Sequence, residues 1–264
     1  MDFITTTSTA GAPPAWMPLQ ELPARRASPP RAAVQCLACT ARTRCLPAGM
    51  SEHEARCLAH MTIGRRRVRK GQAVYHAQDR FLFMYAVHFG TFKSTLMLNN
   101  GADQVTRFHL PGDVMGFDAT VSGRHPSTAT ALEDAEVCVL PYSQLTDACA
   151  EGRGLRLQVI RMAGAELVRD QRLLALIANT HSEQRVAAFL VGLSDRMRER
   201  GLSPSEFLLR MTRAEIGSYL GTTLETVSRS LSAFARRGFI TVHRREIHLQ
   251  DIEALRAEFE PTLP

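Results

Sequence analysis

The sequence predicts an α+β fold: an N-terminal antiparallel β-roll, then one long helix, then a small C-terminal domain of short helices and a hairpin. Three observations predict it: short β-type runs separated by Gly and Asn over about 67–145, a proline-free stretch over 153–180, and a helix–glycine–helix pattern near residue 220. Short strands with regular turn signals are typical of small barrels and sandwiches. With 264 residues, of which 45% are hydrophobic, the chain can form two packed domains.

The composition limits where the protein acts and what it binds. The formal charge of +6 at pH 7 suits a polyanionic partner such as nucleic acid. No run of about 18 apolar residues exists and the N-terminus lacks a signal-peptide pattern, so we expect a cytoplasmic protein without a membrane span. Four parts are predicted along the chain: a flexible tail (1–33), a Cys-bearing loop with the β-roll (34–152), a dimerisation helix (153–180) and a DNA-binding domain (181–264).

Three cysteines lie close together at the start of the second part. Cys36, Cys39 and Cys45 follow the pattern C-x2-C-x5-C, and such clustered thiols in a reducing compartment indicate a metal or redox site. A [4Fe–4S] cluster needs four thiolates, whereas a structural zinc site usually shows two close pairs, and no second pair exists here. A cluster is therefore favoured, with zinc as the competitor. The spacing does not choose the fourth ligand among the remaining cysteines, Cys57, Cys138 and Cys149.

The β-roll and the long helix follow from two different periodicities. Short β-type runs are predicted at 73–75, 83–87, 92–98 and 137–140. In the long helix a seam of heptad spacing predicts a parallel dimer, and its members are Ile160, Ala163, Leu167, Asp170, Leu174 and Ile177. Two Asp170 carboxylates facing each other would repel and make the dimer marginal. The alternative is that Asp170 pairs with Arg169 or Arg172 on the flank of the helix.

A helix-turn-helix is predicted over 212–229. Thr212 can cap the first helix, Gly217 permits close approach of the second helix, and Gly221 supplies a left-handed turn. Thr222 or Thr223 can cap the second helix. We expect the apolar residues of that helix to face inward: Leu224, Val227 and Leu231.

The outward face of the second helix carries the DNA-reading candidates. Glu225, Ser228 and Arg229 can contact base edges in the major groove, because Arg donates hydrogen bonds to guanine and Glu accepts a hydrogen bond from cytosine. Phosphate contacts are expected from Thr222 and Thr223, and Arg213 belongs to a local Arg-rich segment, with a wing hairpin flanking Arg244 and Arg245. The alternative is a helical hairpin whose arginines are only solvated.

These features together resemble the CRP/FNR superfamily of bacterial regulators, specifically its FNR (fumarate–nitrate reductase regulator) branch, over roughly 34–250. The segments that carry the resemblance are Cys36/Cys39/Cys45, Lys70–Gln72, Thr106–Asp113, Gly116–Asp118, Val137–Pro141 and Leu224–Arg229. The resemblance implies a cyclic-nucleotide-binding-like sensor domain, a homodimer and a winged helix-turn-helix. It implies that Cys36, Cys39, Cys45 and Cys138 hold an oxygen-labile [4Fe–4S] cluster.

The resemblance also implies partners. Glu225, Ser228 and Arg229 would bind a TTGAT-type half-site, two of which form the operator, and the dimer would activate or repress genes of anaerobic respiration by contacting RNA polymerase. Cyclic nucleotide is not expected, because Arg124 is separated from Ser127 by His and Pro where the superfamily's phosphate-binding pair would be adjacent.

Two other functions compete with an oxygen-responsive regulator. One is a cluster-free regulator that responds to another small ligand or to thiol oxidation. The other is an iron–sulfur or zinc redox enzyme, which is disfavoured because the sequence contains no P-loop, no G-x-G-x-x-G, no H-E-x-x-H and no nucleophile elbow.

Overall fold

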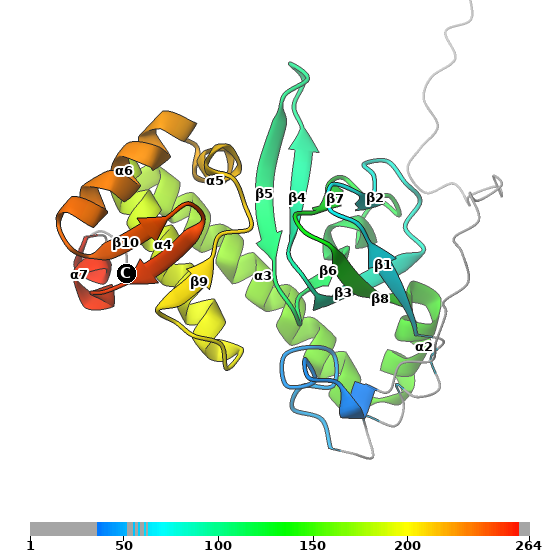
Figure 1. The fold of residues 1–264 in the computed structure, drawn as a ribbon. Helices are drawn as coiled ribbons and strands as arrows, with labels where there is room; N and C mark the ends of the chain where they lie inside the picture. The colour runs from blue at the N-terminus through cyan, green and yellow to red at the C-terminus, as the bar shows by residue number, and fades with distance from the viewer. Residues whose placement is uncertain (1–35, 52–54, 56–57, 59–60, 62, 259–264) are drawn as a thin grey trace, which may run out of the picture.

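The computed structural model describes residues 36–51, 55, 58, 61 and 63–258. The tail predicted over 1–33 and Cys57 lie outside the described residues. Figure 1 shows strands at one end of the molecule, short helices with a small sheet at the other, and one long helix running between them. The α+β class predicted from the sequence is confirmed.

The N-terminal strands form two four-stranded antiparallel sheets, with orders β1-β8-β3-β6 and β2-β7-β4-β5. The strands are β1 (Gly64–Val68), β2 (Ala73–Tyr75), β3 (Phe83–Phe89), β4 (Phe92–Met97), β5 (Asp103–His109), β6 (Val114–Met115), β7 (Thr128–Ala131) and β8 (Ala135–Pro141). Short 3-10 turns cover Cys36–Ala38 and Phe117–Thr120. Buried residues of both sheets, such as Val137 and Phe92, fill the space within the roll.

Strand β8 is central in its sheet because β1 pairs with one edge of it and β3 with the other. Cys138 lies opposite Arg65 of β1 and Ala86 of β3. Its side chain is buried among apolar residues that include Leu46 of the Cys-bearing loop and Leu155 of the long helix. The sheet therefore fixes the place of one cysteine beneath the loop that carries three others.

Three helices follow the strands: α2 (Tyr142–Glu151), α3 (Arg153–Asn179) and α4 (Ser182–Glu199). The predicted long helix is present, and Leu155 and Leu176 are its buried residues. Helix α4 contributes Val186, Leu190 and Val191 to the core of the C-terminal part. Among the described residues, no helix combines the length and apolarity that crossing a membrane requires.

The C-terminal part combines short helices with a three-stranded sheet of order β10-β11-β9. Its elements are β9 (Glu206–Leu208), α5 (Arg213–Leu220), α6 (Leu224–Arg236), β10 (Ile240–His243), β11 (Glu246–Leu249) and α7 (Ile252–Ala257). Strands β10 and β11 form the predicted hairpin, and Arg244 in its turn has φ 56°. Ile216, Leu220 and Phe234 are almost fully buried between α4, α5 and α6. A winged helix-turn-helix architecture results.

Candidate functional site

The Cys-bearing loop packs against the start of α3 and against the middle of β8, where Cys138 lies. Cys36 and Cys45 are half-buried and contact the same apolar cluster that contains Cys138. The side-chain amide of Gln158, on α3, donates a hydrogen bond of 3.3 Å to the carbonyl oxygen of Cys45. The loop is therefore connected to both the β-roll and the long helix.

Burial and mutual repulsion disfavour the ionised form of these thiols. Burial, opposed by the backbone N–H of Leu46 and assisted by the neighbouring thiols Cys138, Cys36 and Cys39, raises the pKa of Cys45 to about 12. Burial likewise raises the pKa of Cys138 to about 12, with Cys36 and Cys39 adding to the increase. Neighbouring thiols thus contribute to the raised pKa of both Cys45 and Cys138.

Cys149 packs against the same apolar cluster as Cys36, Cys45 and Cys138, but only Cys138 is a buried member of it. Burial raises the pKa of the Cys149 thiol, and the charged group that acts on it is the guanidinium of Arg156, which lowers the pKa. Cys36 and Cys39 instead raise the pKa of Cys138, so the arrangement favours Cys138 over Cys149 as the fourth ligand. Sequence spacing left this choice open.

His88 and Glu136 lie beside the thiols. Nδ1 of His88 is 3.6 Å from Sγ of Cys39, and Nε2 of His88 is 3.8 Å from Oε1 of Glu136. Nη1 of Arg65 is 3.5 Å from the same Glu136 oxygen. Burial and then the charge of Arg65 lower the pKa of His88. The sequence gives no sign of this group, because Cys39 comes from the loop, Arg65 from β1, His88 from β3 and Glu136 from β8.

The donor set fits a group that takes soft thiolate ligands. As the described side chains stand, no three His, Cys, Asp or Glu residues are spaced to hold a single metal ion. Cys36, Cys45 and Cys138 nevertheless meet at one apolar cluster and Cys39 lies on the same loop, so the available thiols match an iron–sulfur cluster in ligand type and number.

The first helix of the helix-turn-helix is built as the sequence predicts. Oγ1 of Thr212 accepts a 3.2 Å hydrogen bond from the N–H of Glu215, whose carboxylate accepts one of 2.6 Å from the N–H of Thr212. This capping box starts α5, and Gly221 ends it with φ 63°. A Cβ at Gly217 would lie 2.9 Å from the carbonyl oxygen of Thr222, so the close approach needs glycine.

The second helix is capped by Thr223, which settles the choice between the two threonines. Its Oγ1 accepts a 3.2 Å hydrogen bond from the N–H of Thr226. Val227 and Leu231 are buried as expected, but the expectation for Leu224 was wrong, because its side chain is 46% exposed. Leu224 occupies the first turn of α6, where the helix has not yet reached the core formed with α4.

The predicted DNA-contacting residues share one exposed side of α5 and α6. Glu225 and Arg229 are exposed, Ser228 is half-buried, and Nη1 of Arg213 donates a 3.2 Å hydrogen bond to Oγ of Ser228. Hydrogen bonds from the Glu225 N–H and the Thr223 hydroxyl lower the pKa of the Glu225 carboxyl. A groove of about 780 Å³ follows this side, and its lining is rich in hydroxyl groups and arginine: Ser182, Glu183, Thr226, Ser228, Arg229, Ser230, Ser232, Ala233 and Arg236.

The predicted seam of α3 carries a largely uncovered apolar stripe. Ile160, Leu167 and Leu174 are exposed, while Ala163 and Ile177 are half-buried. A stripe of this spacing on a long helix is suited to a second copy of the same helix.

Asp170 in the same seam has a partner that the sequence did not indicate. Its carboxylate forms an ion pair with Arg107 of β5, whose Nη1 also lies 3.0 Å from Oε1 of Glu166. The alternative that Asp170 pairs with Arg169 or Arg172 was wrong, because the strand places Arg107 against this face of α3. Arg169 instead lies 3.8 Å from Glu166.

Comparison with known proteins agrees with both parts of the fold. Residues 65–151 match the cyclic nucleotide-binding domain family and residues 184–258 match the Crp-like helix-turn-helix domain family. The chain is 40% identical over 225 residues to the fumarate and nitrate reduction regulatory protein of Salmonella typhimurium, covering 85% of this chain and 90% of that protein. The corresponding Escherichia coli protein is also 40% identical, over 223 residues, covering 84% and 89%. The chain belongs to the CRP/FNR family.

Solved structures of this family have the same fold. FixK2 from Bradyrhizobium japonicum superposes with a TM-score of 0.69 at 30% identity, covering 75% of this chain and 97% of that one. A CRP-family transcriptional regulator from Thermus thermophilus superposes with a TM-score of 0.60 at 23% identity, covering 75% and 98%. Members of the CRP/FNR family bind DNA and act as dimers, and the relatives are transcriptional regulators rather than enzymes. The chain is therefore a DNA-binding regulator.

Residues 124–127, where the sequence predicts no phosphate-binding pair, make contacts with other parts of the roll. Oγ of Ser127 donates a 2.9 Å hydrogen bond to the carboxylate of Asp118. The buried His125 ring stacks on Tyr75 at 3.7 Å, and Arg124 points to the carbonyl oxygen of Gln78 at 2.8 Å. A carboxylate bound to Ser127 gives this segment a charge that repels phosphate.

Proposed function

We propose that this protein is an oxygen-responsive transcriptional regulator of anaerobic and microaerobic genes in the cytoplasm, active as a homodimer with a [4Fe–4S] cluster. The observation that supports it most is the packing of Cys36, Cys45 and Cys138 on one apolar cluster beside the start of α3, with Cys39 on the same loop. Soft thiolate donors of this kind are the ligands that iron–sulfur clusters take, and binding the cluster would deprotonate them.

The four cysteines would hold the cluster, and the chemistry that the cluster would supply is its reaction with oxygen. Cys138 is held in place by β1 and β3, while the other three thiols lie on a loop without regular structure beyond one short turn. When the cluster no longer links the thiols, the loop would lose its attachment to Cys138, whereas Cys138 would stay in place in the sheet. Through Gln158 and the apolar contacts of Leu46, that change reaches α3.

Helix α3 supports the second step of the proposal. The stripe of Ile160, Ala163, Leu167, Asp170, Leu174 and Ile177 would pair with its copy in a second subunit. Asp170 puts a carboxylate into an otherwise apolar stripe, and Arg107 neutralises it only partly, since Arg107 is shared with Glu166. We therefore retain the hypothesis of a marginal dimer, which a few kcal/mol from an ordered Cys loop can favour.

The helix-turn-helix would place one subunit on each of two TTGAT-like half-sites. Glu225, Ser228 and Arg229 would contact base edges from the exposed side of α6. The positions of Thr222, Thr223 and Arg213 at the ends of the two helices suit contacts to phosphate. DNA-bound dimers would then contact RNA polymerase, and cyclic nucleotide would play no part because Asp118 holds Ser127.

The test compares two cysteine variants of protein purified without air. We expect Cys138→Ala to lose most of the iron and acid-labile sulfide that the wild type retains. The matched control Cys149→Ala should retain both, because Arg156, and none of the loop thiols, is the charged group that acts on Cys149. Wild-type protein free of iron and sulfide, yet equally tight on its operator, would instead favour a cluster-free regulator that responds to another ligand or to thiol oxidation.

A further inference from the structure

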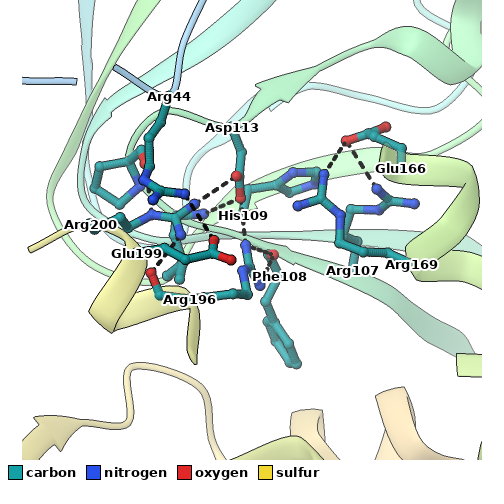
Figure 2. A network of polar contacts seen from close by, with 12 residues as sticks. Arg44, Arg107, Phe108, His109, Asp113, Glu166, Arg169, Arg196, Glu199 and Arg200 are labelled. Carbon is teal, nitrogen blue, oxygen red and sulfur yellow. Dashed lines mark hydrogen bonds and ion pairs between the residues drawn. The ribbon is translucent and has the colours of Figure 1, made fainter. Parts of the chain in front are cut away.

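The Cys loop makes a direct contact with the DNA-binding domain of its own subunit. Nη1 of Arg44, the residue before Cys45, lies 2.9 Å from Oε2 of Glu199 at the last turn of α4. Figure 2 shows the Arg44 side chain extending from the loop toward this carboxylate. Arg44 also packs on the turn between β5 and β6, where a Cβ added to Gly112 would lie 3.0 Å from Cβ of Arg44. One residue of the loop thus contacts both the sensor domain and α4.

The same turn is fastened to α4 by buried charges, which we call the Asp113 cluster: Asp113, Arg196 and Arg200. Oδ1 of Asp113 lies 2.8 Å from Nη2 of Arg200, and Oδ2 lies 2.5 Å from Nη2 of Arg196. Arg196 also donates two 3.1 Å hydrogen bonds to the carbonyl oxygen of Phe108, and Nε of Arg200 donates one of 2.9 Å to that of Pro111. Figure 2 shows this cluster next to the Arg44–Glu199 pair.

The two sets of contacts differ in strength. The side chains of Asp113 and Arg200 are 10% and 8% exposed, so their ion pair is shielded from water. Those of Arg44 and Glu199 are 34% and 56% exposed, so their ion pair is screened by solvent and can be broken at small cost. The buried cluster therefore holds α4 against the roll, and the exposed pair is the contact that a change in the loop can make or break.

We propose that Arg44 and Glu199 are positioning residues that couple the Cys loop to the DNA-binding domain within one subunit, in parallel with dimerisation. This inference rests on the proposed function of the loop. Because coupling between two sites is reciprocal, a loop that favours the DNA-binding arrangement of α4 is itself stabilised when operator DNA holds that arrangement.

The test measures how much saturating operator DNA slows the loss of cluster absorbance after air is admitted. The free energy of an exposed ion pair corresponds to a factor of about 1.5–5 in this protection. We expect Glu199→Gln and Arg44→Gln each to lose that factor while the dimer dissociation constant stays as in the wild type. The charge exchange R44E/E199R should restore it, which a merely structural role would not produce.

Arg198→Gln is the matched control, because Arg198 forms an exposed ion pair on the same turn of α4 without contacting the loop. Operator DNA should slow the loss of cluster absorbance in this variant as much as in the wild type. Equal protection in Glu199→Gln and the wild type, or failure of the charge exchange to restore protection, would overturn the inference.

A wild-type protein that forms no cluster would refute the proposed function but would leave the coupling measurable. In that case the rate at which iodoacetamide modifies Cys45 replaces absorbance. Operator DNA should slow modification in the wild type more than in Glu199→Gln, and equal slowing would overturn the coupling on its own.

Discussion

Replacing Asp113 by asparagine should weaken the attachment of α4 to the β-roll. The carboxylate accepts a 2.8 Å hydrogen bond from the N–H of Leu110 in addition to its ion pairs with Arg196 and Arg200. Asparagine keeps nearly the same volume and removes the negative charge. The guanidinium groups of Arg196 and Arg200 would then lie in a largely buried place where only carbonyl oxygens accept their hydrogen bonds.

The expected loss follows from these contacts. Hydrogen bonds to charged groups contribute about 1.5–3 kcal/mol each, and Asp113 makes two with arginine. Removing one partner of a buried ion pair costs about 3–5 kcal/mol, because the remaining charge is left uncompensated. We therefore expect Asp113→Asn to lower the free energy of unfolding by about 3–5 kcal/mol.

The assay is urea unfolding followed by circular dichroism, with Asp195→Asn as the control. Asp195 pairs with Arg198 and Arg256 at 3.3–3.4 Å in a place exposed to solvent, so its replacement should cost less than about 1 kcal/mol. A loss below about 1 kcal/mol in Asp113→Asn as well would refute the reasoning that burial makes this cluster strong.

The same cluster predicts a pH dependence. Burial alone would raise the pKa of the Asp113 carboxyl, but Arg196, Arg200 and the Leu110 N–H together hold it below its ordinary value. A carboxyl with a lowered folded-state pKa stabilises the protein above the unfolded pKa, and this contribution is lost as pH falls through the folded pKa. The wild type should therefore lose stability below about pH 4, and Asp113→Asn should lose less over that range.

Three further variants test other parts of the account. Gly217→Ala should cost about 1–3 kcal/mol in urea unfolding, since its Cβ would meet the carbonyl oxygen of Thr222 at 2.9 Å; an unchanged midpoint would contradict this packing. Arg229→Ala should lose about 1–3 kcal/mol of discrimination at one base pair, measured on a series of operator variants; a uniform loss on all of them would instead indicate a phosphate contact. Asp170→Ala should increase the dimer fraction in air by sedimentation velocity, because Arg107 keeps Glu166 as a partner and the stripe becomes uncharged; an unchanged fraction would refute the marginal dimer.

The parts of the fold that local chemistry decides could be predicted from the sequence. Thr212 with Glu215, and Gly221 after α5, are signals within one or two turns, so they predict the helix-turn-helix without knowledge of its neighbours. Leu224 shows the limit of such a signal. Its apolar side chain fits the inward face by periodicity, but whether a core reaches the first turn of α6 depends on α4.

The site depends on contacts between distant segments, which the sequence does not show. The proposal of Cys138 over Cys149 depends on the register of β8 with β1 and β3 and on a loop about 100 residues earlier. Asp170 was assigned the wrong alternative partners because helical spacing indicates neighbours on one helix, whereas Arg107 comes from β5.

Absorption spectroscopy combined with operator binding, on one anaerobic preparation before and after air, tests the central claim most directly. We predict a coloured, iron-containing dimer that binds two half-sites, then loss of colour, of dimer and of affinity together in air. A preparation that is colourless from the start, or one that keeps its dimer and its affinity after its colour is gone, would contradict the claim that thiol-held iron controls DNA binding.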